Sequence, residues 1–124
     1  MKIRISPLDR LFSKLIRRRD GFRCQRCGAQ HAENSMGLHA AHIFGRGRYS
    51  VRFHPDNVVA LCFACHMRLD SQPEEKIAWA KKRLGAKKYN ALRRLSDQPA
   101  KFGQVERRQL REALRRCGLA AHEG

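Results

Sequence analysis

The apolar residues near the N-terminus recur with the period of an α-helix over residues 6–21. The positions that share one face are Leu8, Leu11, Phe12, Leu15 and Ile16. Ser6 precedes them as a candidate N-cap, and Pro7 suits the first helical position. Gly21 follows the basic run and is expected to end the helix. The pattern therefore predicts an amphipathic first helix.

The middle of the chain changes to short extended patterns. Residues 37–44, GLHAAHIF, predict a strand, and residues 56–61, DNVVAL, begin a second extended stretch. The basic, glycine-containing sequence GRGRYS between them is typical of a turn. A helix that starts near Cys62 and carries FACHMRLD is expected next. The predicted order is thus strand, turn, strand, helix.

From Pro73 onward the pattern is helical again. Three helices are predicted, over residues 73–85, 86–98 and 104–118. We interpret residues 1–124 as a single α+β domain with an N-terminal helix to residue 21, a core over 22–72 and a basic helical extension over 73–124. In the last helix, Leu110, Leu114 and Cys117 would either form a homodimer interface or pack on the core, and the sequence does not choose between them.

The charge of the chain indicates its class of partner. Lys and Arg number 27 against 11 Asp and Glu, which gives a formal charge of +16 and a pI near 10.9. Such a balance predicts a nucleic-acid partner. An acidic membrane surface is the alternative, but no apolar run approaches the ~20 residues that span a bilayer. The N-terminus lacks the long apolar stretch and cleavage site of a signal peptide, so no signal peptide is predicted.

Four of the five cysteines form two CxxC pairs, with 34 residues between the pairs. In a chain without an export signal, such pairs indicate metal binding before disulfides. Four thiolates make a closed tetrahedral site of the structural kind, so a structural zinc ion is predicted at Cys24, Cys27, Cys62 and Cys65. Unbound thiols are the alternative. The fifth, Cys117, is interpreted as a small apolar residue on a helix face.

Three further residues could carry chemistry. Asn57 follows His42 by 15 residues, and His66 follows Asn57 by 9. A neutral histidine beside one divalent ion can activate water for phosphodiester hydrolysis. His66 and Asp70 are four residues apart, so they share one helix face and could bind one ion. Asn57 would hold the hairpin together or orient His42, and each residue alone is also compatible with a structural role.

Residues 24–70 resemble the HNH endonuclease superfamily in its four-cysteine zinc form, on His42, on Asn57 five residues before Cys62, and on His66. The resemblance implies a ββα-metal core, with a hairpin and a helix around one catalytic ion. It implies that His42 is the general base, that Asn57 fixes the hairpin and that His66 is a metal ligand. Asp70 matches the position of a further ligand in some members.

A narrower resemblance covers roughly residues 22–96. The stretch AHIFGRGRYSVRFHPDNVVALCFACHMRLDSQP, followed by WAKKRLGAKKYNAL, is similar to the phage lambda-type Rap (NinG) recombination nucleases. That family acts on branched DNA such as Holliday junctions and D-loops. The resemblance therefore implies a phage or prophage gene and action in the bacterial cytoplasm. The last 25 or so residues have no counterpart in it.

The chain departs from the HNH pattern immediately before the base. Many members place Asp or His there as a metal ligand, whereas this chain has Ala41. His39 is a candidate substitute, because residues 39 and 41 lie on the same side of a strand, about 7 Å apart. Without His39, the ion (Mg²⁺ or Mn²⁺) would be held by His66 and Asp70 together with phosphate oxygens and water.

Arginines surround the candidate base and form a run in the first helix. We expect them to contact phosphates, because the guanidinium fork matches phosphate geometry; solvated surface charges are the alternative. The predicted nucleic-acid-binding residues are Arg46, Arg48, Arg52, Arg17, Arg18 and Arg19. The leading hypothesis is a metal-dependent DNA endonuclease. A phage nicking, restriction or packaging nuclease, a non-catalytic zinc-stapled DNA-binding module, and a zinc protein that binds RNA or the ribosome are the alternatives.

Overall fold

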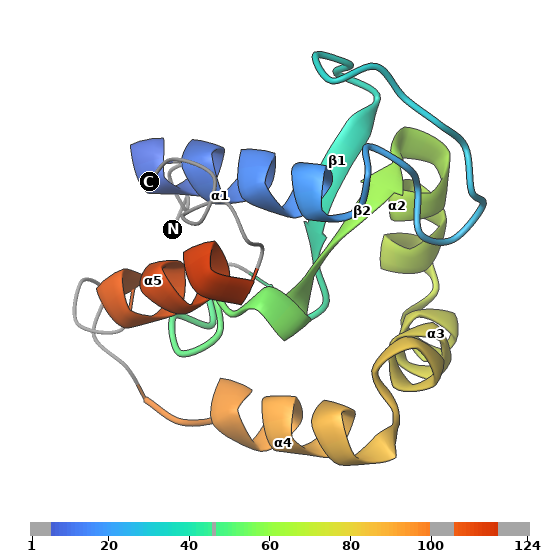
Figure 1. Cartoon of the computed structure of the whole chain (residues 1–124). Coiled ribbons are helices and arrows are strands. Elements are labelled where there is room, and N and C mark those ends of the chain that lie inside the picture. Colours follow the sequence, from blue (N-terminus) through green and yellow to red (C-terminus); the bar gives the residue numbers. More distant parts are fainter. Residues whose placement is uncertain (1–5, 46, 100–105, 117–124) are drawn as a thin grey trace.

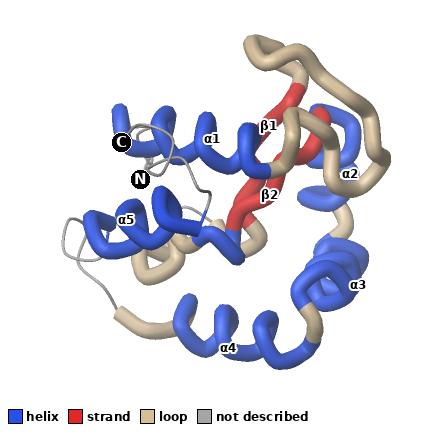
Figure 2. Tube along the Cα trace, in the orientation of Figure 1, coloured by secondary structure: helices blue, strands red, loops and turns tan. Residues whose placement is uncertain are grey.

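The computed structural model describes residues 6–45, 47–99 and 106–116 (Figure 1). Within these ranges the protein is a small α+β fold with five α-helices and one two-stranded antiparallel sheet (Figure 2). The elements are α1 (Pro7–Arg19), β1 (Leu38–His42), the 3₁₀ turn η1 (Pro55–Asn57), β2 (Val58–Cys62), α2 (Phe63–Ser71), α3 (Pro73–Leu84), α4 (Ala86–Ser96) and α5 (Glu106–Arg116). The predicted order of helices and strands is confirmed.

Helix α1 begins with a reciprocal cap. The Ser6 hydroxyl accepts a hydrogen bond from the Asp9 backbone N–H at 3.2 Å, and the Asp9 carboxylate accepts one from the Ser6 backbone N–H at 2.6 Å. This capping box satisfies two backbone donors that a helix start leaves unpaired. Pro7 occupies the first turn, as predicted. The start of α1 is therefore fixed by local sequence.

The sheet is a hairpin that leads directly into a helix. Strands β1 and β2 pair antiparallel, with Leu38 opposite Cys62 and His42 opposite Val58. Cys62 is both the last residue of β2 and the N-cap of α2, where its sulfur accepts a hydrogen bond from the Cys65 backbone N–H. The 43–57 connection between the strands is long, and η1 forms its last turn. A hairpin followed by a helix is thus the centre of the fold.

The sheet is covered on both faces (Figure 1). One face packs on α2, and its buried cluster consists of Cys24, Leu38, Ala41, Val59, Ala60, Leu61, Cys65 and Leu69. The other packs on α1 and α5 through Phe12, Ile16, Phe53, Val58 and Ala113. Ala40 adds to the second cluster and Ala41 to the first, as the alternation of a strand requires.

Helix α5 packs against α1 and η1 of its own chain. Ala113 is 0% exposed, and Leu110 packs against the α1-side cluster. The sequence left open whether Leu110 forms a dimer interface or packs on the core. In the structure Leu110 packs on the core. Cys117 lies outside the described residues. Across the described ranges, none of the helices is long and apolar enough to cross a membrane.

Candidate functional site

The four paired cysteines come together between the 22–28 turn and the start of α2. The sulfur atoms of Cys24, Cys27, Cys62 and Cys65 all lie within 4.8 Å of one another. The Cys27 and Cys62 sulfurs are 3.8 Å apart, which is the edge expected of a tetrahedron with Zn–S bonds of about 2.3 Å and far exceeds a disulfide bond. These four residues can therefore hold a metal such as zinc.

Backbone N–H groups around this site favour the thiolate form of the cysteines. The Cys27 N–H points at the Cys24 sulfur and the Cys65 N–H at the Cys62 sulfur, each at 3.5 Å. Burial raises the pKa of Cys24, but the surrounding backbone N–H groups outweigh it and lower that pKa to about 6. Burial and the neighbouring thiols raise the pKa of Cys65 to about 12, despite a hydrogen bond from Arg26. Four thiolates together therefore require a cation.

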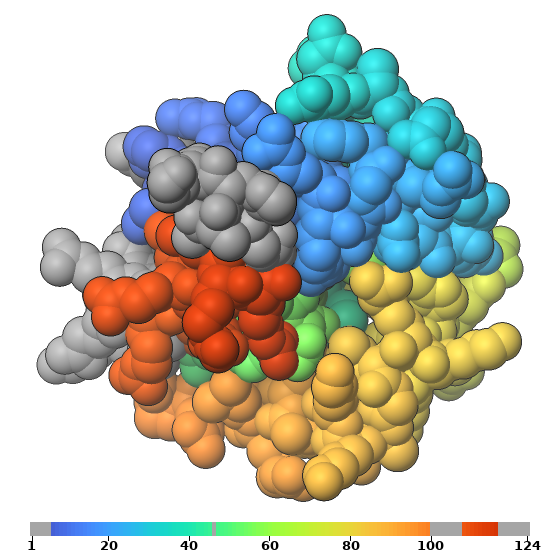
Figure 3. All heavy atoms as spheres, viewed as in Figure 1, coloured from blue at the N-terminus to red at the C-terminus, as the bar shows by residue number. Residues whose placement is uncertain are grey.

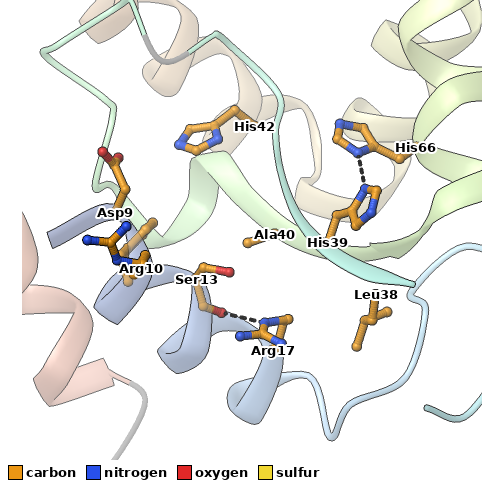
Figure 4. A pocket seen from close by; sticks show the side chains of 10 residues that line it. Asp9, Arg10, Ser13, Arg17, Leu38, His39, Ala40, His42 and His66 are labelled. Carbon is orange, nitrogen blue, oxygen red and sulfur yellow. Dashed lines mark hydrogen bonds between the residues drawn. The ribbon is translucent and has the colours of Figure 1, made fainter. Parts of the chain in front are cut away.

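A second centre is a pocket of about 480 Å³ between β1 and α1 (Figure 4). Three histidines contribute to its lining: His39 and His42 from β1, and His66 from α2. The opposite wall is α1, with Arg10, Ser13 and Arg17 among its lining residues. Histidines that are separated by 27 residues or fewer in sequence thus share one cavity with a basic helix.

The ring of His42 is held by the long connection. Its Nε2 lies 3.0 Å from the backbone oxygen of Arg52. A carbonyl oxygen only accepts hydrogen bonds, so this contact assigns the proton of the neutral ring to Nε2 and the basic lone pair to Nδ1. A histidine oriented in this way is suited to take a proton at Nδ1.

The Asn57 side chain bonds to the backbone of the 43–57 connection between the strands, and the hydrogen bonds described for it do not involve the His42 ring. The side chain is 0% exposed, and its Oδ1 accepts a hydrogen bond from the Phe44 N–H at 2.8 Å. Its Nδ2 donates to the Phe44 oxygen at 2.9 Å and the Val51 oxygen at 3.0 Å. Of the two roles considered for Asn57, these bonds match the one in which it holds the hairpin together.

The segment that carries the Arg52 carbonyl is anchored from both ends of the chain. The Arg52 side chain is 3% exposed and forms a two-pronged ion pair with Asp9 of α1, at 3.0 and 2.5 Å. From α5, the Gln109 side chain accepts a hydrogen bond from the Phe53 N–H at 2.9 Å and donates one to the Ser50 oxygen. Asp9 and Gln109 therefore fix the backbone on which His42 rests.

His39 and His66 contact each other in the lining of the pocket. Their Nδ1 atoms are 2.9 Å apart (Figure 4). This agrees with the expectation that residue 39, on the same side of the strand as residue 41, can substitute for a ligand at that position. His66 Nε2 lies 3.2 Å from Asp70, whose other oxygen contacts Lys76 at 2.8 Å. Asp70 is thus placed to orient His66, a common arrangement behind a metal-binding histidine. Among the described residues, only the cysteines bring three or more candidate ligand atoms together.

The predicted phosphate-binding arginines separate into different environments. Arg52 is buried with Asp9, so the expectation that it clamps a phosphate is not met. Arg48 pairs with Asp97 at the surface, and Arg46 lies outside the described residues. Within the α1 run, the described environments differ as follows: Arg17 lines the histidine pocket, Arg18 is exposed, and Arg19 donates to the Pro55 and Val58 oxygens and pairs with Asp20.

Sequence reasoning missed Asp9 and Gln109 as parts of the site. Asp9 was recognisable only as a helix-start residue, and Gln109 only as a polar position in a basic helix. Arg10 and Ser13 were also missed, although their spacing from Arg17 places them on one helix face. Comparison with protein-family models, with curated proteins and with solved structures finds no match for this chain.

Proposed function

We propose that this protein is a divalent-metal-dependent DNA endonuclease of the HNH type. The observation that carries the proposal is the placement of His42: Nε2 is held by the Arg52 carbonyl, and the ring lines a pocket shared with His39 and His66. A non-catalytic module has no need of a histidine oriented through a buried backbone. The hairpin followed by α2 agrees with the ββα core that the sequence resemblance implies.

His42 acts as the general base in this proposal. Water attacks the phosphorus of a phosphodiester, and Nδ1 of His42 takes the proton from that water. The bond between phosphorus and the 3′ oxygen breaks, and the leaving oxygen takes a proton from solvent. The Arg52 carbonyl stabilises the protonated ring through Nε2, so the same contact that sets the tautomer supports the charged state.

The residues that would hold the catalytic ion are His39 and His66. Two nitrogens that each bind one ion at about 2.1 Å can lie about 3 Å apart, and the observed separation of 2.9 Å fits this requirement. When bound, such an ion supplies Lewis acidity to the phosphate and to the leaving oxygen. In this arrangement Asp70 orients His66 through Nε2 rather than binding the ion, which modifies the expected ligand set.

DNA as the substrate is supported by the +16 charge and by the arginines of the pocket wall. Selectivity for branched DNA, such as Holliday junctions and D-loops, rests on the resemblance to the Rap (NinG) nucleases alone. A zinc ion at the four cysteines would be structural, because a site with four thiolates leaves no position for water.

The test is cleavage of a labelled four-way junction and of a linear duplex with the same arms. Wild type, His42→Ala and His42→Gln would be compared in metal-depleted buffer to which Mg²⁺ or Mn²⁺ is added. Depletion by resin is preferable to a chelator in the reaction, because a strong chelator would also remove metal from the cysteines. We expect cutting that depends on added metal and falls by 10²-fold or more, roughly, in both variants.

A non-catalytic zinc-stapled DNA-binding module is the second candidate. Ala41 offers no ligand next to His42, and Lys76 neutralises Asp70. Tight DNA binding without cutting in any metal would favour this module and would reject the nuclease. Equal cutting of junction and duplex would retain the enzyme and remove the preference for branched DNA.

A further inference from the structure

A second hollow continues from the histidine pocket along α1. It is lined by Lys14, Arg17, Glu33, Asn34, Ser35, Met36 and Leu38, and it shares Arg17 and Leu38 with the first pocket. Its volume is about 740 Å³. The two hollows therefore adjoin each other, and together they are called here the α1 groove, which extends from the three histidines to the segment before β1.

One wall of the α1 groove is a row of cations. Arg10, Lys14 and Arg17 follow one another at helical spacing, so they share one face of α1. Arg10 and Arg17 are about 10 Å apart along the helix axis at about 1.5 Å per residue, which is roughly the length of three stacked nucleotides. The row thus matches a short run of phosphates in length.

These cations lack acidic partners in the described part of the chain. No ion pair involves Arg10, Lys14 or Arg17 there, and Arg17 Nε donates a hydrogen bond to the Ser13 backbone oxygen at 3.3 Å. Asp9, which also lines the first pocket, is already paired with Arg52. Asp20 and Asp97 are paired with Arg19 and Arg48. Glu33 is the acid that lines the outer hollow. The groove therefore concentrates positive charge that the described residues do not neutralise with ion pairs.

The far end of the groove carries an apolar projection. Met36 is 92% exposed, in the segment before β1 that projects at the top of the molecule in Figure 3. The backbone on either side of it is held by Ser35, whose hydroxyl accepts a hydrogen bond from the Gly37 N–H at 3.1 Å and contacts His31 Nδ1 at 3.2 Å. An exposed apolar side chain on such a held backbone, beyond a row of cations, suits the face of a nucleic-acid base.

We propose that the α1 groove binds one strand of the DNA substrate. The phosphates lie on Arg10, Lys14 and Arg17, and a base two or three nucleotides from the scissile bond packs on Met36. This inference rests on the proposed function for the location of the cut, but it concerns binding and is tested without cleavage. It also gives Arg17 a specific role that Arg18 and Arg19 do not share.

The test compares variants that remove equal charge from different surfaces, all made in the His42→Ala background. The groove variant is Arg10→Ala with Lys14→Ala and Arg17→Ala. The control is Lys87→Ala with Lys88→Ala and Arg94→Ala, three exposed positions on α4, which lies across the molecule from α1 (Figure 1). Arg18→Ala is a single-charge control on α1 itself, because Arg18 lines neither hollow. Circular dichroism and zinc content verify folding.

Binding is measured by fluorescence anisotropy with a labelled single strand and a labelled four-way junction, over a range of salt concentrations. The groove variant is expected to weaken strand binding by about tenfold or more and to lower the slope of log Kd against log salt by about 2, since each phosphate contact contributes about 0.7. The α4 control and Arg18→Ala are each expected to change this slope by less than about 0.7, the contribution of one phosphate contact. Equal losses in the groove and α4 variants would overturn the proposal.

A photo-reactive benzophenone side chain in place of Met36 locates the strand directly. Cross-linking to the labelled strand is expected there and not from the same side chain in place of Ile77, which is exposed on α3. More cross-linking from position 77 than from position 36, or about tenfold tighter binding of an RNA of the same sequence, would reject the assignment.

The two proposals can fail separately. If the wild type never cuts DNA but the binding results are as expected, the groove proposal is retained and the nuclease proposal is rejected. If the groove variant with His42 restored still cuts DNA and binds it as the wild type does, only the groove proposal is rejected.

Discussion

The backbone oxygen of Arg52 lies 3.0 Å from His42 Nε2, while the side chain of the same arginine is buried against Asp9. One residue thus connects the candidate base to the first helix. The ion pair holds the segment whose carbonyl contacts the ring, so it can act on His42 through the backbone of residues 50–53.

We predict that His42 carries its proton on Nε2 when neutral. Nitrogen-15 NMR of the histidine rings distinguishes the two tautomers without any assay of activity. In Arg52→Lys the two-pronged pair with Asp9 is lost, so we expect a mixture of tautomers and a kcat about tenfold lower or more, as for other groups that orient a functional histidine. Wild-type His42 with its proton on Nδ1 would contradict the assigned role.

Asp9 should control stability in acid. Burial raises the pKa of Asp9, but hydrogen bonds from Arg52 and Ser6 and the charge of Arg52 outweigh it, so the pKa lies below its usual 3.8. The folded state therefore favours the carboxylate. Its stabilisation is complete above the unfolded pKa, near 4, and is lost as the pH falls through the lower folded value.

The corresponding variant is Asp9→Asn. It leaves Arg52 buried without a charged partner, so we expect a loss of about 3–5 kcal/mol in the free energy of unfolding at neutral pH. The acid dependence below pH 4 or so should also flatten. Urea unfolding at several pH values measures both, and Glu74→Gln, at an exposed position, is the control. If the stability of Asp9→Asn still fell with acid as in the wild type, Asp9 would be excluded as the source of that dependence.

Gln109 should support the site from a distance. Gln109→Leu keeps a similar size but leaves the buried Phe53 N–H and Ser50 oxygen without these partners, so we expect a loss of about 2–3 kcal/mol. The NMR signals of His42 should shift, and DNA cleavage should slow. Arg108→Ala, the exposed neighbour on α5, should change neither. Lower stability with unchanged His42 signals would confine Gln109 to a packing role.

The proposed ion site should prefer Mn²⁺ to Mg²⁺. Imidazole nitrogens suit transition metals, whereas Mg²⁺ prefers oxygen ligands. We expect faster cleavage in Mn²⁺ and about tenfold weaker Mn²⁺ binding in His39→Ala, measured by electron paramagnetic resonance. His39→Asp should shift the preference towards Mg²⁺. Equal rates in the two metals, with no effect of His39→Ala on Mn²⁺ binding, would remove His39 from the site.

The cysteine cluster should bind about one zinc ion per chain and hold the 22–28 turn to α2. In Cys27→Ser we expect zinc to be lost and cooperative thermal unfolding to disappear, because metal binding and folding are coupled in small zinc domains. Mass spectrometry under native conditions and circular dichroism measure the two effects. Cys117→Ser, outside the two pairs, should retain the metal. Full stability after zinc removal would contradict a structural role.

The sequence predicted those features that depend on local spacing. Ser6 and Pro7 marked the start of α1, and the CxxC pairs marked the cysteine cluster, because both signals lie within four residues. Strand alternation made His39 a candidate for the site, and its Nδ1 lies 2.9 Å from that of His66. Whether these two residues bind a catalytic ion stays a prediction.

The fate of the arginines was not predictable in the same way. Arg52 comes two residues after the basic, glycine-containing stretch 45–50 that is typical of an exposed turn, and its partner Asp9 is 43 residues away. In α1, successive residues point about 100° apart, so neighbouring arginines with the same local sequence enter different environments. Arg17 thus lines the pocket while Arg19 binds the Pro55 and Val58 oxygens.

The two anchors of the Arg52 segment also bear on how the chain acquires its structure. The Asp9–Arg52 contact spans 43 residues and the Gln109–Phe53 contact spans 56. Contacts between such distant residues form late in folding, because the intervening chain must first lose its freedom. A chain still emerging from the ribosome would contain all three histidines before Gln109 is synthesised. The histidine pocket is therefore expected to mature only once synthesis has passed α5.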